Sequence, residues 1–215
     1  MAEVALYTPP EHGELVTVRC LAPDDVTPEF GLAALDLKVA AYGEQLGRQF
    51  FVPHLAFQEE YLGGTPTERD EHIERSVDDM LERLEDGGQC AVVYDEDGTL
   101  VSLATVSVLG EDRGLHIDDI LTSRSKQFHG FGSCVTHAAL SAFDKPDETN
   151  VSLEAFSGSE VNNWYLNLGF NAPFSSWRRR TMKIGGYTFN LINHSGSLGG
   201  IKEMLELRSG KPVTS

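Results

Sequence analysis

The sequence predicts an α+β domain in which a central sheet is covered by helices on both faces. Segments of strand character and segments of helical spacing follow one another as strand, helices, three strands, helix, strand, helix and strands. The 215 residues contain no Pro-, Gly- or Ser-rich linker, which favours one domain. Apolar residues make up 40 % of the chain, enough for a large core.

The N-terminal part is expected to form one strand and two helices. A strand is predicted over 16–22, where the run VTVRCLA is apolar and β-branched and Pro23 follows. Leucine and valine with few helix breakers predict a helix over 30–51. Pro53 interrupts this pattern, so a second helical segment is expected over 54–62.

The clearest helix is predicted over 67–85, because apolar residues recur there at helical spacing. These residues are Ile73, Val77, Met80, Leu81 and Leu84. Thr67 and Asp70 stand three residues apart and resemble a capping box with Asp in place of Glu. Gly87 and Gly88 are expected to end the helix, since glycine readily adopts the conformation that closes helices.

Three strands are predicted next. Asp97-Gly98 favours a tight turn, so 90–94 and 100–109 are expected to form a hairpin, and 115–122 a third strand. The remaining expected elements are a loop over 123–132, a helix over 134–143, a strand over 151–156, a helix ending near Gly169, and a closing hairpin of 177–184 and 187–193.

One domain over 1–194 follows from these elements, with a C-terminal tail over 195–215 in which 201–207 can form a short helix. The chain starts without a basic segment followed by a long apolar run, so no cleaved secretory signal is expected. Three widely spaced cysteines fit a reducing compartment better than a disulfide scaffold. These observations predict a cytoplasmic protein.

The charge balance excludes some classes of partner. Lys and Arg number 17 and Asp and Glu number 33, which gives a net charge of −16. Nucleic-acid binding relies mostly on Lys and Arg, so no nucleic-acid partner is expected. No apolar run approaches the roughly 20 residues of a membrane span, so no membrane partner is expected either. The acidic balance serves solubility or steers cationic ligands toward the protein.

The loop 127–132 carries the main chemical signal. Its sequence QFHGFG lies between a predicted strand and a predicted helix. Two close glycines let backbone N–H groups converge, and the start of the helix adds a positive partial charge, so the loop suits a pyrophosphate. Val135 breaks the G-x-G-x-x-G pattern, and the Walker A pattern is absent, which counts against a nucleotide-binding α/β domain.

A second motif, YLNLGF at 165–170, follows this loop. The two motifs match Q/R-x-x-G-x-G/A and Y-x-x-x-G-F, and in this order they resemble the GNAT superfamily of acetyl-CoA-dependent N-acyltransferases. The resemblance covers about 16–193. It implies the GNAT fold, with a central mixed, mostly antiparallel sheet of six to seven strands between helices. Homodimers are common in this family, so a homodimer is one implied partner.

The resemblance implies an enzyme that moves an acetyl group from acetyl-CoA to a primary amine by direct attack in a ternary complex, without a metal. The acceptor would be a small molecule, cationic in view of the charge, or a peptide. Main-chain groups of Ile120, Leu121 and Thr122 would hold the acyl and pantetheine arms. The residues that would hold the pyrophosphate are Gln127, Phe128, His129, Gly130, Phe131 and Gly132. The Tyr165 hydroxyl would protonate the leaving thiolate.

The general base is open between several residues. The family often uses a Glu on the strand before the phosphate loop, and this sequence has none there. Strand alternation puts His116, Asp118 and Ile120 on one face. His116 is closest to the usual Glu position, and imidazole suits a base because it titrates near neutrality. Asp118 would orient or replace His116, and Glu154 on the next strand is a third candidate.

A second class of function stays open. Gly158 and Ser159 replace the family's Asn at the start of the fourth helix, which favours a catalytically degenerate GNAT-like module that binds coenzyme A or serves regulation. Tyr165 and the complete phosphate loop favour the enzyme. Cys134 and His137 stand three residues apart, but no further pair completes a metal site, so a buried thiol and a surface histidine are expected.

Overall fold

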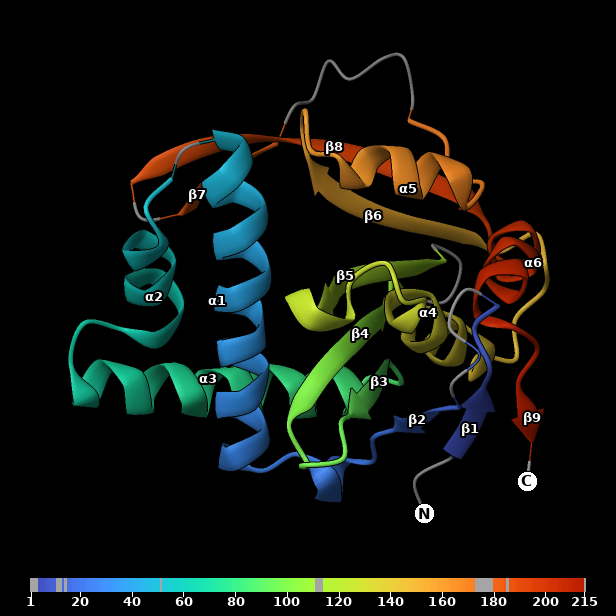
Figure 1. Ribbon diagram of the computed structural model, residues 1–215, viewed down its shortest axis with the longest axis horizontal. Helices are drawn as coiled ribbons and strands as arrows, with labels where there is room; N and C mark the ends of the chain where they lie inside the picture. Colours follow the sequence, from blue (N-terminus) through green and yellow to red (C-terminus); the bar gives the residue numbers. More distant parts are fainter. Residues whose placement is uncertain are drawn as a thin grey trace.

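The structure, a computed structural model, describes residues 4–10, 13, 15–50, 52–110, 114–172, 180–184 and 186–214. Within them a mixed sheet lies between helices on both faces, which confirms the predicted fold class (Figure 1). The strands are β1 (Val4–Tyr7), β2 (Val16–Cys20), β3 (Gln89–Tyr94), β4 (Leu100–Val108), β5 (Leu115–Thr122), β6 (Asn150–Phe156), β7 (Thr181–Ile184), β8 (Tyr187–Ser197) and β9 (Val213–Thr214). The helices are α1 (Pro28–Phe50), α2 (His54–Leu62), α3 (Pro66–Glu85), α4 (Phe131–Ser141), α5 (Val161–Asn167) and α6 (Leu198–Ser209), with short 3-10 turns η1 (Pro23–Asp25) and η2 (Arg124–Lys126).

In the described residues nine strands run in the order β7-β8-β6-β5-β4-β3-β2-β1-β9. Neighbouring strands are antiparallel, except for the parallel pair β5 and β6. The expected count of six to seven strands is too low, because the sequence analysis missed β1 and β9. These two strands at one end of the sheet have only four and two residues, too few to show a periodicity. Of the strand expected over 177–184, residues 177–179 lie outside the described part.

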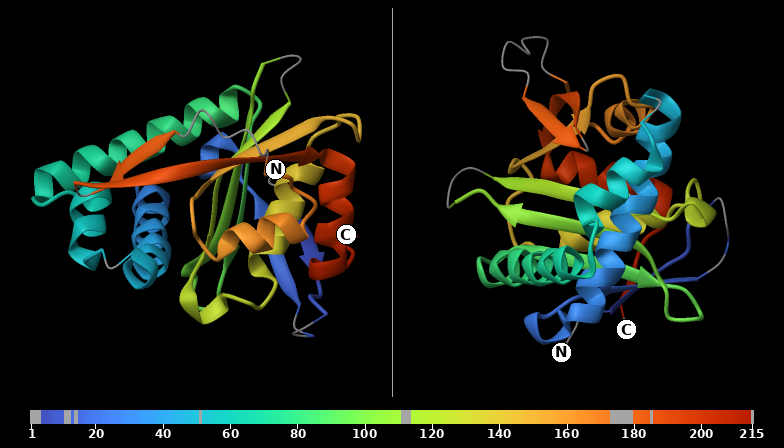
Figure 2. Two further views of the ribbon diagram at one scale, coloured as in Figure 1. Left: turned by 90° about the horizontal axis from the view of Figure 1, so that it is seen from above. Right: turned by 90° about the vertical axis from the view of Figure 1, so that its left-hand side faces the viewer.

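Both faces of the strands β3 and β4 are buried along most of their length. Helices α1 and α3 cover one face, and α4 covers the other with α6 packed against it (Figure 2). On the α4 side, Val106 and Ile117 are buried in the largest apolar cluster. On the α1 side, Cys90 and Leu103 are buried in a second cluster. Alternate residues of one strand thus serve two cores, which explains why these strands are apolar along most of their length.

The observed helix limits agree closely with the predicted ones, but the cap of α3 differs. Thr65, not Thr67, is the N-cap: its hydroxyl accepts from the Glu68 amide at 3.3 Å, and Glu68 Oε2 accepts from the Thr65 amide at 2.9 Å. The predicted capping box of Thr67 and Asp70 is therefore wrong. Pro66 decides the position, since proline at the first helical residue has the required φ and loses no internal hydrogen bond.

Over the described residues 195–214, the C-terminal segment packs against the rest of the domain rather than extending away from it. Strand β8 continues to Ser197, and α6 follows it directly. Leu198, Ile201 and Leu205 of α6 are fully buried in the cluster on the α4 side. The short helix expected in this segment is therefore present and contributes to the main core. No helix in the described residues is both long and apolar enough to cross a membrane.

Candidate active site

Strands β5 and β6 are parallel neighbours that separate along their length (Figure 1). Their pairing begins at Leu115 and ends with Ile117 opposite Leu153. Beyond these positions β5 continues to Thr122 and stays paired with β4 on its other side. On the side that faces β6, the N–H and C=O groups of 118–122 thus have no strand to pair with within the described residues. Such an edge can pair with an extended ligand. This edge includes the residues expected to hold the acyl and pantetheine arms.

A bulge at Asp118 changes which residues of β5 share a face. Two successive β4 residues pair with Asp119 and Ile117, on either side of Asp118. Ile120 packs against the α4 side of the sheet, whereas Asp118 and Asp119 contact α3 and α1. The predicted common face of His116, Asp118 and Ile120 is therefore wrong, because the extra residue interrupts the strand alternation.

The three candidate bases each have a polar partner. His116 Nδ1 lies 3.0 Å from Ser152 Oγ, where β5 and β6 are still joined. Asp118 forms an ion pair with Arg83 of α3 at 3.3 Å. Glu154 forms an ion pair with the exposed side chain of Arg180, just before β7, at 3.2 Å. Their roles as bases stay predictions.

Asp119 is an acidic side chain that the sequence analysis did not select. Its Oδ2 lies 2.9 Å from Nζ of Lys38, and its Oδ1 accepts a hydrogen bond from the Tyr42 hydroxyl at 2.9 Å. Burial raises the pKa values of Tyr42, Tyr61 and Tyr165, and the Asp119 charge raises them further. Asp119 thus lies within electrostatic reach of three tyrosines. Two adjacent carboxylates in an otherwise apolar strand were the signal that could have found it.

Tyr165 projects from α5 into an aromatic cluster beside the separation of β5 and β6. Its ring centroid lies 5.1 Å from that of Trp164, 6.1 Å from Phe170 and 5.6 Å from His194. Because burial raises the pKa of Tyr165, its hydroxyl keeps its proton at neutral pH. A protonated phenol held in a fixed position can donate a proton to a leaving group.

The start of α4 forms a cradle whose two glycines let neighbouring parts of the chain approach closely. Gly130 is the N-cap residue with φ 80°, and a Cβ there would come within 2.8 Å of Pro9 Cβ. A Cβ on Gly132 would lie 3.2 Å from Thr122 Oγ1 at the end of β5. No side chain caps the helix, so the N–H groups of its first turn, which no helix satisfies internally, can bind an anion.

The loop before this cradle carries two cations and is tied to β5. Arg124 and Lys126 lie in η2. Gln127 Nε2 donates to the Thr122 carbonyl at 3.3 Å. Phe128 has a left-handed backbone, with φ 65°, and its ring is 90 % exposed. The glycines of the cradle, the uncapped helix and the two cations together fit a pyrophosphate.

The start of α5 lacks the family's Asn at Gly158, as the sequence indicates, but Asn162 occupies the first turn. Its Nδ2 donates to the carbonyls of Phe156 and Ser159, both at 2.8 Å. Its Oδ1 lies 2.7 Å from His194 Nε2 on β8. Asn162 therefore joins β6, α5 and β8, and it fixes the helix that carries the candidate proton donor.

His137 differs from its predicted surface position. Cys134 is buried, as expected, but His137 is buried too, with only 2 % of it exposed. Its Nδ1 lies 2.9 Å from the Tyr7 hydroxyl. The expectation of a surface histidine is wrong because β1, which the sequence analysis missed, covers this side of α4.

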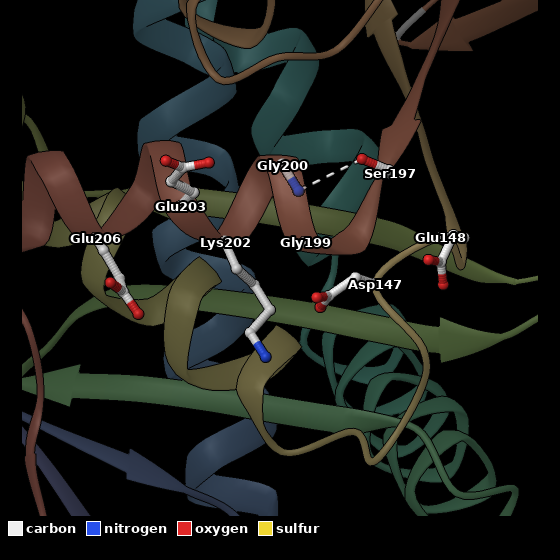
Figure 3. Close-up of a pocket in the computed structure, with 8 residues that line it drawn as sticks. All are labelled: Asp147, Glu148, Ser197, Gly199, Gly200, Lys202, Glu203 and Glu206. Carbon is white, nitrogen blue, oxygen red and sulfur yellow. Dashed lines mark hydrogen bonds between the residues drawn. The ribbon is translucent and has the colours of Figure 1, made fainter.

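Two surface depressions lie away from the predicted loop residues. The larger, of about 540 Å³, opens beside the start of α6 (Figure 3). Its lining residues are Asp147, Glu148, Ser197, Gly199, Gly200, Lys202, Glu203 and Glu206. Its carboxylates would repel a phosphate, so it is a poor site for coenzyme A. The smaller, of about 360 Å³, lies between the end of α1 and β8, where Phe50 and Phe189 line it.

No protein-family profile and no curated protein matches the chain. Its structure resembles solved N-acetyltransferases. A GCN5-related N-acetyltransferase from Rhodopseudomonas palustris matches with a TM-score of 0.57 at 14% identity, over 85% of this chain and 95% of that one. An N-acetyltransferase from Staphylococcus aureus Mu50 matches with a TM-score of 0.53 at 13% identity, over 84% and 97%.

A third similar structure is the PaiA N-acetyltransferase from Thermoplasma acidophilum, solved in complex with coenzyme A. It matches with a TM-score of 0.51 at 10% identity, over 82% of this chain and 97% of that one. At such identities the likeness concerns the fold, and it spans nearly the whole of each relative. The chain has the fold of the GNAT superfamily of N-acetyltransferases.

Proposed function

We propose that the protein is an acetyl-CoA-dependent N-acetyltransferase that acts on a primary amine of a small molecule or a peptide. One observation carries the proposal. Within the described residues, the structure combines the strand edge that β5 leaves free on separating from β6, the glycine cradle that follows β5 and the half-buried Tyr165 of the helix that follows β6. Direct acetyl transfer needs these three parts to hold the thioester and protonate its sulfur.

Acetyl-CoA would supply an acetyl group that is already activated as a thioester. The amides of 127–132 and the first turn of α4 would bind its pyrophosphate. The main chain of 120–122 would orient the arm that carries the acetyl group. Holding both reactants in place removes much of the entropic cost of a bimolecular reaction.

Protons must move at two places. The acceptor ammonium loses a proton before its nitrogen attacks the acetyl carbon, and His116, Asp118 and Glu154 are the proposed acceptors of that proton. Asp119 is a fourth, because it lies on the part of β5 that has separated from β6. As the bond from the acetyl carbon to sulfur breaks, the Tyr165 hydroxyl donates its proton to the sulfur. The second proton that the nitrogen loses on forming the amide returns to the Tyr165 oxygen, directly or through water.

A GNAT-like module that binds coenzyme A without turnover is the second candidate, and Gly158 in place of the family's Asn is the observation that favours it. Thermal unfolding with acetyl-CoA, and with NADH and ATP as controls, tests both candidates. Acetyl-CoA at about 100 times its dissociation constant should add about 2.7 kcal/mol to the free energy of unfolding. Release of free thiol with an amine present then supports the enzyme, and binding without release supports the module.

A matched pair of variants tests the loop assignment. Gly132→Asp places a carboxylate in the first turn of α4, where it favours the helix but repels a pyrophosphate. Gly132→Asn has the same shape without the charge. The thermal shift with acetyl-CoA should be lost in the Asp variant and largely kept in the Asn variant. Equal shifts in both variants would contradict a pyrophosphate site at this helix.

A further inference from the structure

Lys38 of α1 lies in a half-buried enclosure beside the candidate active site. Its Nζ is 2.9 Å from Asp119 Oδ2. The same Nζ lies 5.8 Å from the ring centroid of Tyr42 and 5.5 Å from that of Tyr61. Aromatic faces attract ammonium groups at such distances, and the carboxylate balances the charge. We call Tyr42, Tyr61 and Asp119 the ammonium cage.

The cage is built from three separate elements. Tyr42 comes from α1, Tyr61 from α2 and Asp119 from the bulged part of β5. The Tyr42 hydroxyl donates to Asp119 Oδ1, which fixes the carboxylate and leaves Oδ2 for an ammonium. The cage walls are therefore held in place without Lys38.

Two features distinguish the cage from a closed structural ion pair. The side chains of Lys38 and Asp119 are 24 % and 17 % exposed, so water and small solutes can reach them. The Tyr61 hydroxyl is buried and has no hydrogen-bond partner within the described residues. Buried polar groups usually have a partner, so this hydroxyl is available to an N–H group or a polar atom of a ligand.

The surroundings of the cage set the kind of cation it can take. Phe156 contacts the edge of the Tyr42 ring with centroids 5.7 Å apart, and Phe189 contacts Phe156 at 5.3 Å. Phe189 also lines the smaller of the two depressions. An ammonium on a hydrocarbon stem fits such walls, and the Lys38 side chain is itself an ammonium of this kind.

We propose that the ammonium cage receives the acceptor amine of the reaction, and that Lys38 fills the cage when no acceptor is bound. This inference rests on the proposed acetyl transfer. Asp119 lies on the part of β5 that has separated from β6, so an ammonium in the cage is beside the strand edge proposed to hold the acetyl arm. The acceptor class is thus a primary alkylammonium, which must displace the chain's own lysine.

The test uses n-butylammonium, which has the four-carbon stem and the charge of a lysine side chain. Lys38→Ala empties the cage, so n-butylammonium should raise the unfolding temperature of this variant more than that of the wild type. Neutral 1-butanol should not do so. Lys38→Ala combined with Asp119→Asn should lose the effect, because the carboxylate is gone. For this binding arm, which contains no acetyl-CoA, Lys126→Ala is the matched control, since Lys126 also lies over a ring, that of Phe131, at 5.3 Å. n-Butylammonium should stabilise Lys126→Ala no more than the wild type.

The kinetic arm measures thiol release from acetyl-CoA with n-butylamine. Removing a competitor that fills most of the cage lowers the apparent dissociation constant of the acceptor, so its KM should fall on the order of tenfold in Lys38→Ala. Lys38→Met, which keeps the length but not the charge of the side chain, should also lower KM. It replaces Lys38→Ala in the test if the Ala variant does not fold.

Each outcome decides one question. No extra stabilisation of Lys38→Ala by n-butylammonium would overturn the cage. Stabilisation with an unchanged or higher KM would overturn its role as the acceptor site. The binding arm contains no acetyl-CoA, so stabilisation by the amine in a protein that acetyl-CoA does not stabilise would reject the proposed acetyl transfer and keep the ammonium site.

Discussion

Tyr165 is the single side chain on which the proposed chemistry most depends. Tyr165→Phe removes the hydroxyl and keeps the ring that contacts Trp164, Phe170 and His194. Turnover should therefore fall by on the order of a hundredfold, the usual effect of losing a general acid, while affinity for acetyl-CoA changes little. Steady-state thiol release and thermal shift measure the two quantities.

Tyr7→Phe is the control, because it also removes a buried tyrosine hydroxyl but lies on β1 at the other edge of the sheet. Its turnover per folded molecule should equal that of the wild type. Wild-type turnover in Tyr165→Phe would instead assign the proton to water or to another group.

The sequence could identify several site residues one by one, but not which of them lie together in the structure. Gly130 and Gly132 follow from a local pattern, since a loop between a strand and a helix folds largely by its own backbone preferences. The adjacent carboxylates drew attention to this part of the strand, but strand alternation does not place Asp118 and Asp119 on the same face. The bulge at Asp118 depends on how β4 pairs with β5, which the sequence of β5 does not show.

Three elements, β1, α4 and α6, meet at one buried histidine. His137 of α4 bonds to the Tyr7 hydroxyl, and its Nε2 lies 3.7 Å from Glu206 of α6. Burial lowers the pKa of His137 below its ordinary value of 6.5, although the Glu206 carboxylate raises it in part and Lys202 lowers it further. The joint of the three elements is therefore sensitive to protonation.

The contribution of His137 to the free energy of unfolding should decrease as the pH is lowered. Because the folded state binds the His137 proton less readily than the unfolded state, the contribution is complete above about pH 6.5 and is lost as the pH decreases below it. The free energy of unfolding, measured by urea between pH 5 and 8, should fall more steeply toward acid for the wild type than for His137→Gln. The exposed His54 is the control, and His54→Gln should follow the wild-type profile. Parallel profiles for wild type and His137→Gln would contradict the inference.

The molecule as a whole depends on its C-terminal helix for a complete core. Leu205 of α6 is fully buried, whereas Leu207, two residues on, is 67 % exposed. Leu205→Ala should lower the free energy of unfolding by about 2–5 kcal/mol, the usual cost of a cavity at a buried leucine. Leu207→Ala should change it by less than about 0.5 kcal/mol, as surface substitutions do. Urea unfolding measures both, and similar small losses would show that α6 folds apart from the sheet.

The order and limits of most elements were accessible from the chain alone. Helical spacing, β-branched runs and turn residues are local, and the structure reproduces 54–62 and 115–122 without change. The two motifs indicated the GNAT fold for the same reason, because each lies within one loop or one helix end. Such features depend on residues a few positions apart, which a sequence displays directly.

Contacts between distant residues were not accessible in this way. Lys38 and Asp119 stand 81 positions apart, and Tyr7 and His137 stand 130 apart, yet each pair bonds at 2.9 Å. Pairing across the sheet brought them together, and one extra residue in β5 turned Asp119 toward α1. The ammonium cage and the buried histidine therefore exist only in the folded chain, because packing and strand register, not local preference, place their members side by side.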